Sequence, residues 1–248
     1  YNVRAEPRSN NAYAAGSGVC TGGAHRRVDL LRSLQRRRAT HRKLRAKDRP
    51  LKNDCVSDEE YQRLLQAWLD NMARVLEPGR GFYIWGGYAN CTHYPPMLKA
   101  ANLYFSQTII WVKEYPVLTC KDYMGNHEVC YYGWKEGAAH QFFGPHNAVD
   151  VWSVKKPNPI KMIHLAEKPV ELALRAIQYS SREGECVLDL FGGSGSTLIA
   201  AEQTGRRAFL MEIDPLYCDV IVRRWEQFTG RRAERDGKGH SSSDSVDA

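Results

Sequence analysis

From residue 57 onward, the order of apolar and polar positions predicts a chain that alternates helices and strands. Ser57 and the acidic residues after it form a capping box, and apolar residues then recur every three or four positions as far as Leu76. This stripe predicts a helix that ends at Pro78-Gly79. The uninterrupted apolar run at residues 81–85 predicts a strand buried on both faces.

The remaining elements follow in a regular order. A short helix is predicted at 97–102, with strands at 106–113 and 128–134. The last third predicts a helix with Pro169 as its first residue, a strand at 186–190, a helix at 196–204, a strand at 208–212, and a helix capped by Asp214, with Pro215 first, that ends before Gly230. Alternating helices and strands predict an α/β fold with a doubly wound, mostly parallel sheet.

Four segments lack this periodicity. Residues 1–25 are rich in Gly, Ala, Asn and Ser and predict a loop. The pattern in 26–52 is compatible with a helix over 28–47 and also with disorder. Residues 135–165 predict a long irregular excursion, and the polar residues 231–248 predict a disordered tail.

Charge separates the N-terminal segment from the rest. Residues 26–52 hold twelve Lys and Arg against two Asp, in a chain whose overall formal charge is +7, so the remainder is net negative. Such a segment fits a nucleic-acid partner, and it equally fits a solvated loop without a partner. No apolar run is long enough for a membrane span and no signal peptide is visible, so we expect a cytoplasmic protein.

Cysteine and histidine spacing gives no indication of a disulfide framework or a metal site. The seven cysteines are odd in number and form no CxxC pair. His127, Glu128, His140 and His146 match no metal-ligand spacing, so we expect no metal.

The segment 187–197 carries the clearest candidate site. An apolar strand ends at Asp189, a glycine-rich turn follows, and a helix begins after it. Glycines allow a sharp turn and a close approach of the backbone to a ligand. Glu212 lies twenty positions after Gly192, at the end of the next strand, where a carboxylate can accept hydrogen bonds from ribose hydroxyls.

The same turn argues against nucleotide cofactors that carry phosphates. Leu198 replaces the third glycine of the dinucleotide pattern, and the Gly-Lys-Ser/Thr of a phosphate loop is absent. The carboxylate of Asp189 would repel a pyrophosphate but attract an ammonium group. S-adenosylmethionine has a ribose, an adenine and an amino acid without phosphate, so we expect it as the cofactor.

These motifs resemble those of the amino-group DNA methyltransferases. Residues 189–197 and 209–215 resemble the cofactor motifs, and the likeness extends over about residues 50–230 through Lys52-Asn53-Asp54, Trp111-Val112-Lys113, residues 127–137 and Glu167-Lys168-Pro169. It is greatest to the group whose catalytic motif precedes the cofactor motif. The resemblance therefore implies a Rossmann-like S-adenosylmethionine-dependent fold with a circularly permuted motif order.

The resemblance also implies roles for single residues. Asp189 would hold the methionine amino group, Glu212 would bind ribose, and Lys168 would lie beside the methionine end. An exposed lysine at position 168, a helix-capping role for Glu212 and a helix-initiating role for Asp54 are the alternatives. The implied cofactor-binding set is Asp54, Lys168, Pro169, Asp189, Phe191, Gly192, Gly193, Ser194, Gly195, Ser196, Thr197 and Glu212.

The family methylates with a short motif of Asp, Asn or Ser, two prolines and an aromatic residue, which is not complete in this chain. Tyr94-Pro95-Pro96 has the prolines in the wrong order. Because the chain begins Tyr1-Asn2-Val3, we expect a fragment cut inside that motif, with Tyr1 as the residue that stacks on the flipped base. The strand before the motif would then be missing as well, methyl transfer by the fragment would be feeble, and tyrosine favours adenine as the target.

We therefore expect a site-specific DNA methyltransferase acting on adenine N6, in a bacterial or phage-infected cell. Cytosine N4 and a catalytically decayed nucleic-acid-binding protein are the alternatives. The domains are 1–52, a catalytic-motif remnant with a basic variable loop, 53–230, the methyltransferase domain, and the tail. Residues 135–165 either read bases or form an aromatic lid packed on the core. The expected contacts to double-stranded DNA are Arg36, Arg37, Arg38, Arg42, Lys43 and Arg45.

Overall fold

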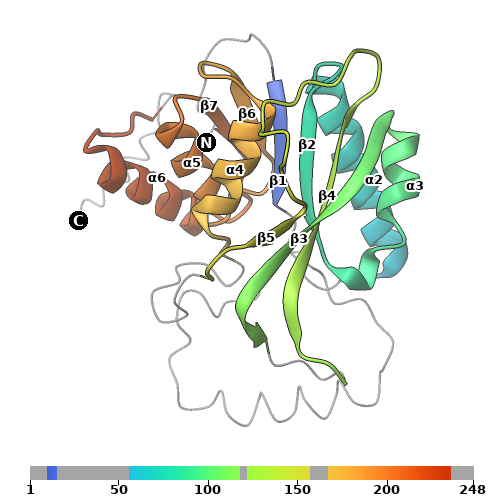
Figure 1. The fold of residues 1–248 in the computed structure, drawn as a ribbon. Helices are drawn as coiled ribbons and strands as arrows, with labels where there is room; N and C mark the ends of the chain where they lie inside the picture. Colours follow the sequence, from blue (N-terminus) through green and yellow to red (C-terminus); the bar gives the residue numbers. More distant parts are fainter. Residues whose placement is uncertain (1–9, 16–55, 118–121, 157–166, 236–248) are drawn as a thin grey trace, which may run out of the picture.

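The computed structural model describes residues 10–15, 56–117, 122–156 and 167–235. Within them, seven strands form one sheet in the order β5-β3-β4-β2-β1-β6-β7 (Figure 1). The strands are β1 (Asn10–Ala15), β2 (Gly81–Gly86), β3 (Leu103–Val117), β4 (Gly125–Lys135), β5 (Val151–Ser153), β6 (Cys186–Asp189) and β7 (Arg207–Leu210). The helices are α2 (Asp58–Val75), the 3-10 helix η2 (Tyr88–Asn90), α3 (Tyr94–Ala100), α4 (Val170–Ser180), α5 (Ser196–Gln203) and α6 (Pro215–Thr229).

The sheet is mostly parallel, as the alternating pattern predicts. Among the described strands only β4 runs against its neighbours, β2 and β3. All other pairs, from β5-β3 to β6-β7, are parallel. Helices cover both faces (Figure 1), which confirms the doubly wound α/β fold.

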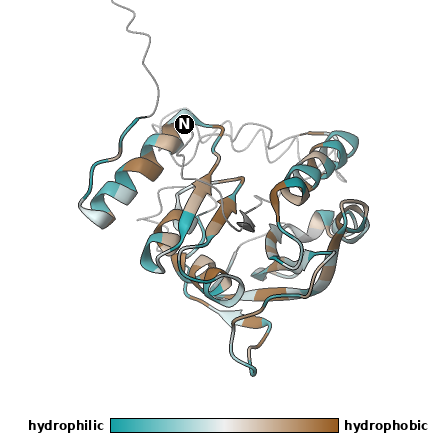
Figure 2. Cartoon of the chain, turned by 90° about the horizontal axis from the view of Figure 1, so that it is seen from above, coloured by the Kyte–Doolittle hydropathy of each residue, from teal (hydrophilic) through white to brown (hydrophobic). Residues whose placement is uncertain are grey.

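Strand β2 shows why its sequence is apolar at every position. Phe82 and Ile84 face the core beneath α2 and α3, whereas Tyr83 and Trp85 face the core beneath α4 and α5. Because side chains alternate between faces, a central strand covered on both sides needs an uninterrupted apolar run. Seen from above, both the helices and the strands carry hydrophilic and hydrophobic segments (Figure 2).

Strand β3 changes the face to which its side chains point. The register against β4 shifts between Phe105 and Gln107. Phe105 therefore packs toward α2 and α3, whereas Ile109 and Trp111 pack toward α4. An extra residue in one strand reverses the inside-outside alternation, and periodicity alone does not reveal it.

The expected loop at residues 1–25 is wrong for residues 10–15. These residues form β1, which pairs in parallel with β2 on one side and β6 on the other. Its sequence, Asn-Asn-Ala-Tyr-Ala-Ala, has low β propensity, so it carries no strand signal. The position of β1 between β2 and β6 is decided by the backbone N–H and C=O groups of those two strands, which would otherwise be unpaired and which any extended segment can satisfy. The helix expected over 28–47 lies outside the described residues.

The helix ends are set largely by the residues that the sequence indicates. Ser57 Oγ accepts the N–H of Glu60 at 3.2 Å at the start of α2, and Asp214 Oδ1 accepts the N–H of Leu216 at 3.0 Å at the start of α6. Pro169 is the capping residue of α4, one position before its expected place inside the helix. In the described part of the chain, no helix combines the length and apolar character of a membrane span.

Helix α3 begins at Tyr94, three residues before the expected start. Its first turn contains two prolines, whose missing N–H groups have no helical partner to lose at that position. The prolines therefore belong to a helix start. They do not form part of the family's catalytic motif, in which the aromatic residue follows the two prolines.

Candidate functional site

The glycine-rich turn connects the carboxyl end of β6 to the start of α5. Gly193 and Gly195 have φ values of 53° and 79°, a left-handed conformation that favours glycine. The N–H of Met211 donates to the carbonyl of Asp189 at 2.9 Å, and the N–H of Gly192 donates to the carbonyl of Met211 at 2.7 Å. The turn is thus joined to the end of the neighbouring strand β7.

Asp189 lies at the base of the turn and is buried, with 1% of its surface exposed. Its Oδ1 accepts the N–H of Phe191 at 2.9 Å, and its Oδ2 accepts the hydroxyl of Thr197 at 2.6 Å. These bonds make Asp189 the residue that fixes the shape of the turn. They also place a negative charge directly beneath it.

Glu212 is partly exposed and holds the turn from the other strand. Its Oε2 accepts the N–H of Gly193 at 2.8 Å, and its Oε1 accepts the N–H of Asp214 at 2.9 Å. The N-cap of α6 is Asp214, so Glu212 supports the helix start through the N–H of Asp214 but is not the cap itself. The structure brings both carboxylates singled out from the sequence to the same turn: Asp189 is the last residue of β6, and Glu212 lies two residues beyond the end of the adjacent parallel strand β7, which ends earlier than the sequence predicts.

Lys168 and Pro169 lie directly against this turn. The hydroxyl of Ser196, the first residue of α5, donates to the carbonyl of Lys168 at 2.7 Å. Pro169 is buried beside it. The segment that precedes α4 is therefore part of the same site, although it is far from the turn in sequence.

The Lys168 ammonium is buried in an ion-pair cluster, which excludes the alternative of an exposed lysine. Its side chain is 10% exposed, and its Nζ lies 3.5 Å from Glu128 Oε2. Lys113 Nζ lies 2.8 Å from the other carboxylate oxygen of Glu128. Burial alone would raise the pKa of Glu128, but the positive charges of Lys168 and Lys113 lower it below its ordinary value.

Phe191 extends the site toward α2. Its ring meets Trp68 edge-on, with 4.8 Å between ring centroids and an interplanar angle of 81°. Trp68 was expected only as part of the apolar stripe of its helix. No sequence signal distinguishes it from the other core positions of α2.

The donor set fits a nucleoside that carries an amino acid. The hydroxyls of Ser194, Ser196 and Thr197 are buried and bonded within the site, so they shape the turn around the carboxylates of Asp189 and Glu212. A pyrophosphate site would favour basic residues, and none of residues 189–197 is basic. An ammonium and ribose hydroxyls are the groups that two carboxylates attract.

Two glycines of the turn also allow the close approach of α6. A Cβ on Gly192 would lie 3.0 Å from Cδ1 of Ile221, and a Cβ on Gly195 would lie 3.2 Å from its Cγ2. A side chain at either position would therefore push against α6. These glycines serve the packing of the fold as well as the turn.

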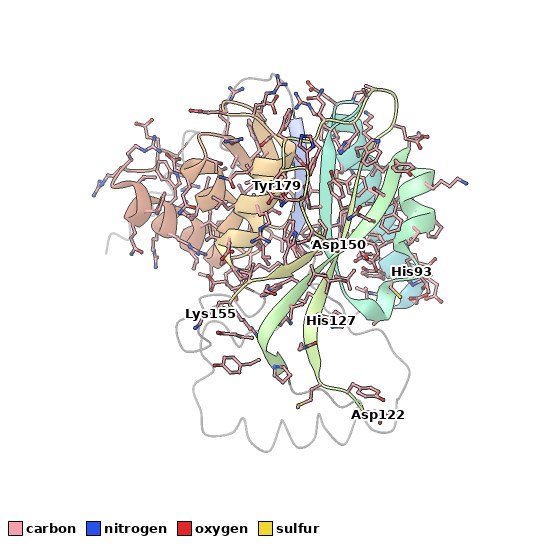
Figure 3. The ribbon with its side chains drawn as sticks, viewed as in Figure 1. His93, Asp122, His127, Asp150, Lys155 and Tyr179 are labelled. Atoms are coloured by element: carbon pink, nitrogen blue, oxygen red, sulfur yellow. The ribbon has the colours of Figure 1, made fainter. Side chains whose placement is uncertain are left out.

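The described start of the expected excursion, residues 135–143, packs on the core at the end of the sheet opposite the turn. His140 stacks on Trp134 with centroids 4.0 Å apart, and the N–H of Phe143 donates to the carbonyl of Tyr179 at 2.8 Å. Tyr179 lies at the end of the sheet opposite His127 and Lys155 (Figure 3). These contacts favour the lid interpretation for residues 134–143 over base reading.

Several expected site residues lie outside the part of the chain that the structure describes. They are Tyr1, Asp54, Arg36, Arg37, Arg38, Arg42, Lys43 and Arg45. Their roles stay predictions. Conversely, Lys113 and Glu128 belong to motifs noted in the sequence, but their ion-pair cluster with Lys168 emerges only when β3, β4 and the start of α4 meet.

The fold and the turn define an α/β protein with a nucleoside-cofactor site. The model of the DNA methylase family of N6 and N4 enzymes matches residues 44–223, so the chain belongs to this family of amino-methyltransferases. S-adenosylmethionine is the cofactor of the family, which confirms the expected cofactor.

Curated relatives agree with this assignment. The chain is 25% identical over 185 residues to the type II methyltransferase M2.DpnII of Streptococcus pneumoniae, a match that covers 68% of this chain and 69% of the relative. It is 24% identical over 206 residues to M.HpaI of Haemophilus parainfluenzae, covering 74% of this chain and 66% of that protein. The chain thus spans about two thirds of the length of each.

Solved structures share the fold. The complex of M1.HpyAVI with S-adenosylmethionine superposes with a TM-score of 0.63 at 19% identity, covering 88% of this chain and 89% of the other. The cytosine-N4-specific PvuII DNA methyltransferase gives a TM-score of 0.61 at 14% identity, covering 88% and 79%. These likenesses show the α/β methyltransferase architecture.

Proposed function

We propose that this chain transfers a methyl group from S-adenosylmethionine to an exocyclic amino group of double-stranded DNA, and that the acceptor is N6 of adenine. One observation carries the cofactor part of the proposal, whereas the choice of adenine rests on Tyr1 and the resemblance alone. Asp189 and Glu212, at the ends of the adjacent parallel strands β6 and β7, both bind backbone N–H groups of a single glycine turn that has no basic residue.

Each residue of the site has a proposed part in holding the cofactor. The buried charge of Asp189 favours the methionine ammonium above the turn, and the partly exposed Glu212 accepts from the ribose hydroxyls. Phe191, supported by Trp68, lies beside the adenosine portion. Lys168 and Pro169 border the methionine end, and Asp54 is a further contact that we propose from the resemblance alone.

The cofactor supplies a methyl group activated by a sulfonium. With the cofactor held there, the amino nitrogen of a flipped base would take the methyl group from the sulfonium sulfur and would then give up a proton. Tyr1 is proposed to stack on the flipped base. Arg36, Arg37, Arg38, Arg42, Lys43 and Arg45 are proposed to contact DNA phosphates, with affinity that falls steeply as salt rises.

The test measures cofactor binding first and the methylated base second. Isothermal titration of the chain with S-adenosylmethionine is expected to show binding, and Asp189→Ala is expected to abolish it. DNA incubated with deuterated cofactor is then digested to nucleosides, and mass spectrometry is expected to find labelled N6-methyldeoxyadenosine at a low level, in keeping with the feeble transfer expected of this chain. Binding without any labelled nucleoside would support the decayed alternative, and absence of binding would contradict the cofactor assignment.

Cytosine N4 is the second candidate acceptor. It is favoured by the structural likeness to PvuII DNA methyltransferase, which is cytosine-N4-specific. The same digest distinguishes the two, because labelled N4-methyldeoxycytidine in place of the adenine product would select this candidate. We propose the cytoplasm of a bacterial or phage-infected cell as the place where the enzyme acts.

A further inference from the structure

Arg224, on the inner side of α6, binds the glycine turn and the segment before α4 at the same time. Its Nη1 lies 2.9 Å from the carbonyl oxygen of Ser194 and 3.1 Å from the Ser194 hydroxyl. The same nitrogen lies 3.1 Å from Oε1 of Glu167. One guanidinium nitrogen thus joins three chain segments that are remote in sequence.

A second path of hydrogen bonds connects the same segments. The Ser194 hydroxyl lies 3.3 Å from the Ser196 hydroxyl, which in turn donates to the carbonyl of Lys168 at 2.7 Å. Glu167 and Lys168 are neighbours in the chain, so the two paths close a ring. The ring runs from Arg224 through Ser194, Ser196 and Lys168 to Glu167 and back to Arg224.

The environment of the ring makes the arginine difficult to replace. The Glu167 side chain is 7% exposed and that of Arg224 is 22% exposed, so the ion pair is largely removed from water. Ser194 is buried and lies between two glycines in the left-handed conformation. Such glycines have wide conformational freedom when nothing holds them, so an external anchor decides which turn conformation is populated.

We propose that Arg224 is a positioning residue that holds the glycine turn and the Glu167–Pro169 segment in the arrangement that binds the cofactor. This inference rests on the proposed function, since it concerns the same site. Glu212 holds the turn at Gly193 from the side of β7, and Arg224 holds it at Ser194 from the side of α6. With the turn fixed at both residues, less ordering is left to occur when the cofactor binds.

The experiment separates a positioning role from a purely structural one. Arg224→Met removes the anchor but leaves the buried Glu167 carboxylate without this cation, which destabilises the fold. Combining it with Glu167→Gln removes that charge, so the double variant is expected to regain thermal stability. Arg223→Met is the matched control, because Arg223 is adjacent on α6 and exposed. Arg224→Lys keeps the charge and a donor group.

Two measurements are made on each folded variant. In calorimetric titration with S-adenosylmethionine, the double variant is expected to bind at least about tenfold more weakly than the native chain, as loss of a charge-assisted hydrogen bond predicts. Arg224→Lys is expected to be intermediate and Arg223→Met unchanged. In hydrogen exchange without cofactor, the amides of Gly193 and Gly195 are expected to exchange faster in Arg224→Met and in the double variant, and at the native rate in Arg223→Met.

The outcomes separate this inference from the proposed function. A double variant with native affinity and native amide protection would overturn the positioning role. If the native chain fails to bind S-adenosylmethionine, the proposed function and the inference built on it both fail, even where exchange at the turn is accelerated. Native binding together with a weakened, stable double variant supports both.

Discussion

Thr197 donates its hydroxyl to the buried carboxylate of Asp189 at 2.6 Å, across the turn that separates the end of β6 from the first residues of α5. The two residues face each other because the glycine turn brings the first turn of α5 back beside the end of β6. The bond satisfies an oxygen of a carboxylate that is 1% exposed, and it fixes the helix start against the strand end.

Removing this hydroxyl should destabilise the fold. Thr197→Val keeps the shape of the side chain but leaves Oδ2 of Asp189 without this donor, and we expect the free energy of unfolding to fall by about 1–3 kcal/mol. Urea titration monitored by circular dichroism measures the change. Thr197→Ser retains the hydroxyl and should stay close to the native value. Equal losses for the valine and serine variants would show that the methyl group matters more than the bond.

Trp68 should influence cofactor binding although it lies on a helix outside the turn. Trp68→Ala removes the edge-on contact with Phe191, and we expect an affinity for S-adenosylmethionine lower by about two- to tenfold, in line with the energy of an aromatic pair. Calorimetry measures the affinity. Trp68→Phe keeps an aromatic edge against Phe191 and should bind nearly as the native chain does.

The Glu128 cluster should make stability depend on acidic pH. The pKa of Glu128 in the folded chain is lowered below the ordinary value of 4.5, so its contribution is present above that value and is lost as pH falls through the lowered pKa. Glu128→Gln should therefore reduce the melting temperature at neutral pH, and the difference from the native chain should vanish in acid. Scanning calorimetry over this pH range measures it.

The control for this cluster lies on the same hairpin. Glu114 forms an exposed ion pair with Lys155 at 3.5 Å, and exposed pairs contribute little. Glu114→Gln should therefore leave the melting temperature unchanged at every pH. A difference between Glu128→Gln and the native chain that persists in acid would contradict the ion-pair explanation.

Arg80 should matter for stability and not for the cofactor. Its Nη1 and Nη2 donate to the two carboxylate oxygens of Glu185 at 3.0 and 2.8 Å. These bonds join the starts of β2 and β6 at the end of the sheet opposite the turn. Arg80→Met removes the arginine partner of the largely buried Glu185 carboxylate, which keeps only its bond to the N–H of Arg182, and should lower the unfolding free energy by about 3 kcal/mol. The folded variant should bind S-adenosylmethionine normally. Arg63→Met, in an exposed pair with Glu60, should change neither quantity.

Much of the fold was predictable because its signals are local. The capped starts of α2 and α6, the buried strand β2 and the glycine turn each depend on residues within a few positions of one another. The two carboxylates Asp189 and Glu212 were also predictable, since strands joined by one helix in a parallel sheet end side by side.

What depends on remote segments was not predictable. The β1 strand has no sequence signal, and its place follows from the unpaired edges of β2 and β6. The reversal of faces along β3 comes from its register against β4. Residues 134–143 have the aromatic composition of a recognition surface. They nevertheless pack at the end of the sheet opposite the turn, because the chain leaves β4 at that end.

The sequence by itself determined the class of cofactor, because residues 189–197 hold the glycine turn, one of the two acids and no basic residue, and Glu212 follows at a fixed spacing. Only the tertiary structure decided what holds that turn. Arg224, Glu167, Trp68 and the Glu128 cluster come from elements far apart in the chain. Their partners are set by packing of the sheet and helices, which no local spacing of residues encodes.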